Sequence, residues 1–206
     1  MGNQQGGTCM VEQIILSGKL GDGCLVKYCK NAIIRFNSIH LNYLIFKKIQ
    51  LEMGGIRTTD ISFGISGYNR QRKIPKFSSH VDERITKAYY MSKKECIENL
   101  DIIGIIMLFL DDGSYHKRAG TGNLYVNTFT LEELNALIDK IYEYYPQKKC
   151  SIYHDNKKDG RSYPYLYIPK IVMENFKKDI AMFVKTYNIP EMFYKAGLPS
   201  TTIRKE

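Results

Sequence analysis

The feature that most constrains this chain is a pair of apolar segments that each end on aspartate and glycine. The first is ILSGKLGDG, residues 15–23, and the second is IIMLFLDDG, residues 105–113. Aligned on their Asp-Gly ends, they superpose Asp22 on Asp112, 90 residues further along. Self-similarity at a fixed period indicates an internal repeat. The repeat predicts a chain built from two related halves.

The segments after each motif follow in the same order. Each half shows two strand-like pieces, a helix-like piece, two more strand-like pieces and another helix. Thr130 and Glu133 have the spacing of a capping box, which predicts a helix start in the second half. We therefore predict an α/β (α+β) fold with two pseudo-symmetric αββαββα halves, each with an antiparallel sheet. The expected boundaries are a flexible N-terminus at 1–11, halves at 12–92 and 102–199, a linker at 93–101 and a tail at 200–206.

Composition narrows the class of partner. The chain has 206 residues, is 44% apolar, and carries 30 basic against 21 acidic side chains, a net charge of +9. This balance favours a polyanion, with nucleic acid ahead of a membrane surface. No apolar run is long enough to span a bilayer and the start lacks the features of a signal peptide, so we expect an intracellular protein, in a bacterial or phage-infected cell or an organelle. The five cysteines are scattered, which predicts reduced thiols.

The acid at the end of each apolar segment conflicts with helix electrostatics. A helix C-terminus already carries unpaired carbonyls and partial negative charge, and the next glycine is expected to adopt the left-handed conformation that ends a helix. A divalent cation would remove the conflict, because Mg²⁺ prefers carboxylate, carbonyl and water oxygens. Asp-Gly is also a common helix stop, and one instance would be structural. Two instances at the repeat spacing favour a function. The small residues Ser17, Gly21 and Gly104 would let the two motif helices approach closely.

The two motifs resemble those of the LAGLIDADG homing endonucleases, in the single-chain branch with two motifs. The second is similar to that branch's WFMDDGS form, and YNIPEMFYKAGLP resembles its IPxxxYK signature. The resemblance spans residues 12–199, although Ser17 and Lys19 depart from the usual first motif. It implies two sheets that together form a DNA-binding saddle. It also implies Mg²⁺ or Mn²⁺ bound at the penultimate acid of each motif.

Residue roles follow from the resemblance. The matching catalytic, metal-binding acids are Asp22 and Asp112, with Gly21 and Asp111 as neighbouring metal-site residues; helical geometry turns Asp111 about 100° from Asp112, so a supporting role suits it better. Lys195 matches the family's basic residue near the cleavage site. Lys94 is its counterpart in the first half, and Lys93 remains an alternative. The alternative for each of these lysines is a solvated surface charge without a catalytic role.

The predicted DNA contacts are basic and amide side chains of the strands and their turns. In the first half they are Lys27, Lys30, Arg35, Arg57, Arg70, Arg72, Lys73 and Lys76, and in the second Lys117, Arg118, Asn123, Asn127, Lys157, Lys158 and Arg161. Most would grip phosphates rather than read bases. The tyrosines of YPYLY, residues 163–167, alternate as in a half-buried strand, which favours core packing over base stacking.

The leading hypothesis is a monomeric, site-specific homing endonuclease that cuts both strands of a long asymmetric duplex and mobilises an intron, an intein or its own gene. Residues 1–100 carry 15 basic and 8 acidic side chains and residues 101–206 carry 15 and 13, which indicates unlike half-sites. One alternative is an intron maturase of the same fold that binds intron RNA. Another is a degenerate DNA-binding protein. Two acids facing a polyanion favour the nuclease, because binding alone gives no reason to keep them.

Overall fold

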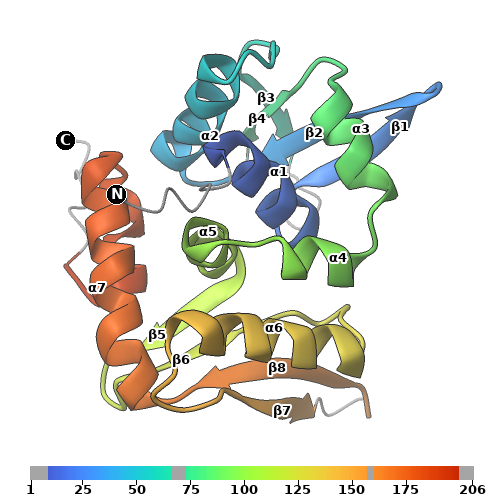
Figure 1. Cartoon of the computed structure of the whole chain (residues 1–206). Helices are drawn as coiled ribbons and strands as arrows, with labels where there is room; N and C mark the ends of the chain where they lie inside the picture. Colours follow the sequence, from blue (N-terminus) through green and yellow to red (C-terminus); the bar gives the residue numbers. More distant parts are fainter. Residues whose placement is uncertain (1–8, 66–72, 157–159, 200–206) are drawn as a thin grey trace, which may run out of the picture. The chain divides into compact units, whose positions relative to one another are not determined.

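The computed structural model describes residues 9–65, 73–156 and 160–199. The chain divides into two compact units, Met1–Met107 and Leu108–Glu206, so the boundary falls inside helix α5 (Figure 1). The first part of the chain contains α1 (Met10–Leu20), β1 (Cys24–Tyr28), β2 (Asn31–Asn37), α2 (Leu41–Met53), β3 (Ser62–Ile65), β4 (Lys73–Ser78), α3 (Glu83–Tyr90) and α4 (Lys93–Glu98). The second contains α5 (Ile102–Asp112), β5 (Gly113–His116), β6 (Thr121–Leu124), α6 (Leu131–Tyr144), β7 (Ser151–Asn156), β8 (Ser162–Ile168), α7 (Lys170–Thr186) and the 3₁₀ helix η1 (Pro190–Ala196).

The two sheets have the same topology. Both are antiparallel and four-stranded, in the orders β1-β2-β4-β3 and β5-β6-β8-β7. Since the strand order, the connecting helices and the preceding motif helix all recur, the predicted αββαββα repeat is confirmed.

In the first unit, helices cover one face of the sheet. Alternate residues of β2 point to this face, and Ala32, Ile34 and Phe36 are at most 1% exposed. A Cβ at Gly18 of α1 would lie 2.7 Å from the Phe36 ring, so α1 rests directly on the sheet. The opposite face, which carries Arg35 and Asn37, is free of described helices and is called the open face below.

The second unit repeats this arrangement, with α6 lying along the sheet in Figure 1. Leu124, Leu166 and Ile168 are buried on the covered face. A Cβ at Gly122 would lie 2.8 Å from the Met173 sulfur of α7. Because strand residues alternate between faces, the open face of this sheet carries the residues between these buried positions.

Two helix starts are fixed by capping boxes. In α6, the Thr130 hydroxyl accepts from the Glu133 amide at 3.2 Å, and the Glu133 carboxylate accepts from the Thr130 amide at 2.8 Å, as predicted. Ser92 and Glu95 form the same reciprocal pair at the start of α4. Residues 93–98, expected to act as a linker, are therefore a packed helix. Among the described residues, no helix combines the length and apolar character needed to cross a membrane.

Candidate functional site

The first motif ends in a tight turn that exposes Asp22. Helix α1 stops at Leu20, and the amides of Gly21 and Gly23 donate to the carbonyls of Ser17 and Gly18, each at 2.8 Å. A Cβ at Gly23 would lie 2.7 Å from the Gly18 carbonyl oxygen and 2.9 Å from the Gly18 Cα. Position 23 therefore requires glycine, because its backbone packs against the backbone of Gly18.

The second motif runs from helix to strand without an intervening loop. Helix α5 continues through Asp111 and Asp112, both half-buried, and β5 begins at Gly113. A Cβ at Gly113 would lie 2.4 Å from the Phe109 carbonyl oxygen. Neither Gly113 nor Gly23 adopts a left-handed conformation, so that expectation was wrong. Both glycines serve close packing instead.

Each acid lies where its motif helix meets its sheet. The Asp112 carbonyl accepts from the Tyr125 amide at 3.1 Å, which continues the β5–β6 ladder by one pair. In the first unit, β1 begins two residues after Asp22, with Cys24 opposite Arg35. The carboxylate of each motif is thus placed at the edge of an open sheet face.

Lys195 is brought to the second acid. It lies on η1, is only 7% exposed, and its ammonium donates to the Gly113 carbonyl, one residue from Asp112. A buried ammonium requires hydrogen-bond acceptors, so this lysine is not a solvated surface charge. The positive charge lies beside the peptide that follows the motif acid.

The first half places its lysines differently. Lys93 and Lys94 are half-buried in the first turn of α4, and both remain candidates. Sequence reasoning treated Lys19 only as an oddity of the motif. Its ammonium donates to the carbonyls of Ala88 at 2.8 Å, Tyr89 at 3.2 Å and Met91, and so satisfies the C-terminal end of α3. This lysine ties the end of α1 to the segment that leads into α4.

The donors at the two motif ends suit a hard divalent cation only in part. The first end offers the carboxylate of Asp22, and the second offers those of Asp112 and its neighbour Asp111. Backbone carbonyls such as that of Gly21 lie nearby. Across residues 9–65, 73–156 and 160–199, no group of three or more His, Cys, Asp or Glu side chains is arranged to hold a metal ion. Mg²⁺ commonly uses one or two carboxylates and completes its shell with water and substrate phosphates. The residues present fit that mode of binding.

The open face of the first sheet carries a groove with both polar and apolar side chains in its lining. A cavity of about 770 Å³ lies over it, lined by Arg35, Asn37, Ser62, Lys76 and other residues of the four strands. A Cβ at Gly64 would lie 3.0 to 3.2 Å from three side-chain atoms of Lys76, so the lysine chain lies across this glycine. Within the described part of the chain, the Arg35 and Lys76 side chains form no ion pair. Both charges are available to an anion.

The other described contacts predicted for the first half do not share this face. The register pairs Lys27 with Ala32 and Lys73 with Ile65, which places both lysines on the helix-covered side. Lys30 lies in the β1–β2 turn and Arg57 in the loop after α2, both exposed. Arg70 and Arg72 lie outside the described residues. Of the six that the structure describes, only Arg35 and Lys76 are brought together on the open face.

In the second half, Asn123 lies on the open face and is half-buried, with its amide 3.4 Å from the Tyr125 hydroxyl. Lys117 and Arg118 occupy the exposed β5–β6 turn, and Asn127 follows β6. Arg161 precedes β8, with its guanidinium 5.9 Å from the Tyr163 ring. Lys157 and Lys158 lie outside the described residues.

The tyrosines of β8 are not core residues. Leu166 and Ile168 fill the covered face, so the alternating Tyr163, Tyr165 and Tyr167 lie on the open face and are partly exposed. The interpretation of these tyrosines as core packing was therefore wrong. The alternation predicted for residues 163–167 is confirmed, but the apolar residues between the tyrosines occupy the buried face.

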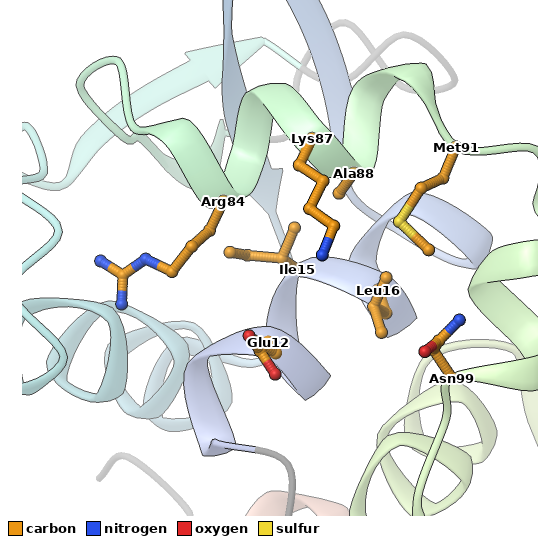
Figure 2. A pocket seen from close by; sticks show the side chains of 8 residues that line it. All are labelled: Glu12, Ile15, Leu16, Arg84, Lys87, Ala88, Met91 and Asn99. Atoms are coloured by element: carbon orange, nitrogen blue, oxygen red, sulfur yellow. The ribbon is translucent and has the colours of Figure 1, made fainter.

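A second, smaller cavity lies between α1 and α3 (Figure 2). It has a volume of about 80 Å³ and is lined by Ile15 and Leu16 of α1 and by Arg84, Lys87 and Ala88 of α3, among others. Small-molecule sites measure roughly 300 to 1,000 Å³. This cavity is well below that range, and its lining includes neither Asp22 nor Asp112.

Comparison with known proteins identifies the family. The model of the LAGLIDADG DNA endonuclease family matches residues 13–176, well over half of the chain. The chain belongs to this family. Its two units correspond to a single-chain, two-motif LAGLIDADG protein. A comparison with curated protein sequences finds no match.

Solved structures show the same fold. The homing endonuclease I-WcaI bound to its DNA recognition sequence matches with a TM-score of 0.68 and 19% identity, over 97% of this chain and 96% of that one. I-DmoI in complex with DNA and Mn matches with a TM-score of 0.51 and 12% identity, over 86% and 95%. The N-terminal LAGLIDADG domain of DUF199/WhiA matches with a TM-score of 0.52 and 17% identity, over 86% and 84%. At these identities the likeness establishes the LAGLIDADG fold alone.

Proposed function

We propose that this LAGLIDADG protein is a site-specific endonuclease that hydrolyses one phosphodiester bond in each strand of a long, asymmetric DNA duplex with a divalent cation. The observation that carries the proposal is the recurrence of one arrangement in both units. In each, an acid at the end of the motif helix or just beyond it lies at the edge of a sheet that has one open face. The match to I-WcaI, a homing endonuclease bound to DNA, supports it.

Asp22 of the first unit and Asp112 of the second would each supply a carboxylate for divalent cation binding, by Mg²⁺ or Mn²⁺, with the Gly21 carbonyl and Asp111 in supporting places. When bound, such a cation activates water and stabilises charge on the attacking and leaving oxygens. The chain itself supplies the carboxylates and the surface that orients the duplex. Carboxylates repel a phosphate, so the acids alone cannot attract DNA. The structure of I-DmoI with DNA and Mn supports a divalent cation.

Lys195 supplies positive charge beside the second acid. Its ammonium is nearly buried and anchored on the Gly113 carbonyl, so its position is fixed before substrate binds. Fixed charge placed where negative charge develops lowers the barrier without reorganisation. In the first half, Lys94 or Lys93 takes this role.

DNA binding is assigned to the open faces. Arg35 and Lys76 would contact phosphates or guanine edges, and Asn37 has the donor and acceptor pair that matches adenine in the major groove. The two open faces differ in side chains, and one chain carries both. An asymmetric target read by a monomer follows from this difference.

The test is cleavage of a plasmid library of random target sequences with Mg²⁺. The native protein should give double-strand breaks at a small set of related sites. Asp22→Asn and Asp112→Asn should lose cleavage and keep DNA affinity, or gain it, because each removes a negative charge facing phosphate. No cleavage by the native protein, together with tight binding of an intron RNA, would instead establish a maturase.

A further inference from the structure

Each motif acid begins a row of residues that runs across its sheet. In the first unit, continuing the Cys24–Arg35 register places Asn37 opposite Asp22, and Asn37, Lys76 and Ser62 are direct neighbours on three strands. We call these three residues the polar row. In the second unit, Tyr125 pairs with Asp112 through its amide, and Tyr125, Tyr165 and Tyr153 occupy the equivalent positions. We call these three the tyrosine row.

The tyrosine row is a continuous aromatic surface. The Tyr165 ring lies 5.7 Å from that of Tyr125 and 6.0 Å from that of Tyr153, the latter nearly parallel at 24°. Tyr167 extends the surface, with its ring 5.4 Å from that of Tyr153. Tyr153 is 50% exposed and Tyr125 is 38% exposed, although both lie on the sheet of a folded protein. The row therefore presents partly exposed aromatic rings to whatever occupies the open face.

The positions of the row limit what it can bind if the proposed function holds. A sheet face that enters the major groove meets base edges, and the thymine C5-methyl is the apolar group that those edges offer. The ring carbons of these tyrosines, placed against amino and carbonyl groups, would desolvate them without giving hydrogen bonds in return. Against methyl groups it buries apolar area on both sides.

We propose that the tyrosine row reads thymine methyl groups in the base pairs nearest the cleavage position of one half-site. This rests on the proposed function, since it requires duplex DNA on the open face. The polar row reads hydrogen-bonding base edges at the equivalent base pairs of the other half-site. The two halves of one fold thus recognise chemically different base pairs through residues at equivalent positions of the two sheets.

Tyrosines also pair across strands for stability alone, and such pairs contribute to the sheet whether or not a ligand is present. Aromatic faces on a four-stranded sheet can also stack with bases of single-stranded nucleic acid. In the tyrosine row, Tyr165 has an aromatic neighbour on each side, which leaves its faces less accessible to a base. The packing therefore favours groove contact over stacking.

The experiment uses binding rather than cleavage. Duplexes that bind the full-length Asp22→Asn variant are selected from a random pool, and thymines of the selected site are then replaced by deoxyuridine in one half at a time. Deoxyuridine lacks only the C5-methyl. We expect affinity to fall in one half alone, by about fourfold for each methyl buried. Equal affinities for thymine and deoxyuridine in both halves would overturn the proposal.

Variants connect the effect to the tyrosine row. Tyr153→Ser, at an exposed position of β7, should abolish the preference for thymine, and Tyr153→Phe should retain it. Lys76→Ala is the matched control from the polar row, and it should weaken binding while leaving the preference intact. Thermal melting confirms that each variant is folded. A preference unchanged in Tyr153→Ser, or a tyrosine-dependent preference for single strands, would contradict the proposal.

The outcomes separate this inference from the proposed function. A pool that yields no bound duplex overturns both. A selected duplex without thymine discrimination overturns the reading of methyl groups and leaves the endonuclease intact. Thymine discrimination by a protein that cuts no DNA supports the reading and overturns the endonuclease.

Discussion

Gln13 offers a quantitative test of how the motif helices are held. Its side chain is fully buried in α1, and its oxygen accepts from the Asp101 amide at 2.9 Å while its nitrogen donates to the Asn99 carbonyl at 3.1 Å. A Cβ at Gly104 would lie 2.2 Å from the same Gln13 oxygen, so α5 begins in direct contact with α1. The amide of one glutamine therefore fixes the start of the helix that ends at Asp112.

Replacing Gln13 by Met keeps the length of the side chain and removes both hydrogen bonds. Each net hydrogen bond contributes roughly 1 kcal/mol, and leaving its partner unpaired costs about 1 to 3 kcal/mol. Since both partners are partly exposed, water can replace some of the loss, and we expect a total of about 2 kcal/mol. Helix α5 should also be less well placed, which lowers the rate of cleavage.

The assay is equilibrium unfolding in urea, with Gln50→Met as the matched control. Gln50 lies on α2, and the contact of its amide nitrogen is with the Met53 sulfur at 3.9 Å. The control should change the free energy of unfolding by less than about 0.5 kcal/mol. If Gln13→Met and Gln50→Met unfold at the same urea concentration, the anchoring role assigned to Gln13 is refuted.

Three further predictions follow from single contacts. The Arg84 guanidinium, which donates to both oxygens of Asp82, holds the pKa of that carboxyl below its usual range. The stabilisation from the charged Asp82 carboxyl is present above its unfolded-state pKa and is lost as pH falls through the lowered folded-state pKa. Asp82→Asn should therefore flatten the acid limb of the plot of melting temperature against pH. An unchanged limb would refute this. Gly113→Ala should destabilise the fold by about 2 kcal/mol in urea unfolding because its Cβ meets the Phe109 carbonyl; a change near zero would contradict the close approach. Lys76→Ala should make the dependence of log affinity on log salt shallower by about one unit, whereas Lys73→Ala, on the covered side, should leave the slope unchanged. Equal effects would contradict the assignment of faces.

Local signals in the sequence predicted the elements well. The capping box of Thr130 and Glu133 and the repeated order of strands and helices depend on neighbours in the chain, and both are confirmed. The capping box of Ser92 and Glu95 carries the same signature and could have predicted α4. A run of charged residues was interpreted as a linker instead.

Which face a strand residue occupies could not be predicted as well. Alternation places Tyr163, Tyr165 and Tyr167 on one side of β8, but the choice of side depends on which residues meet the helices. Large aromatic residues suggested the core, whereas Leu166 and Ile168 fill it. Lys27 and Lys73 are exposed and basic, as expected of DNA contacts, yet strand register places them on the covered side. Register depends on pairing across the sheet, which one strand does not encode.

Glycine roles also depended on tertiary contacts. Gly23 and Gly113 were expected to adopt a left-handed conformation, because glycine after a helix commonly does so. In the structure, backbone and side-chain atoms of the preceding turn leave no room for a Cβ at either position. Lys19 likewise gained its explanation only from the carbonyls at the end of α3.

The central claim is that the acids ending the two motif helices are the catalytic residues of a DNA endonuclease. Its most direct test is cleavage of the selected target by Asp22→Asn and by Asp112→Asn with Mg²⁺, measured on each labelled strand alongside duplex affinity. We expect both variants to lose double-strand cleavage while binding the target at least as tightly as the native protein. Cleavage of both strands at the native rate by either variant would contradict the claim.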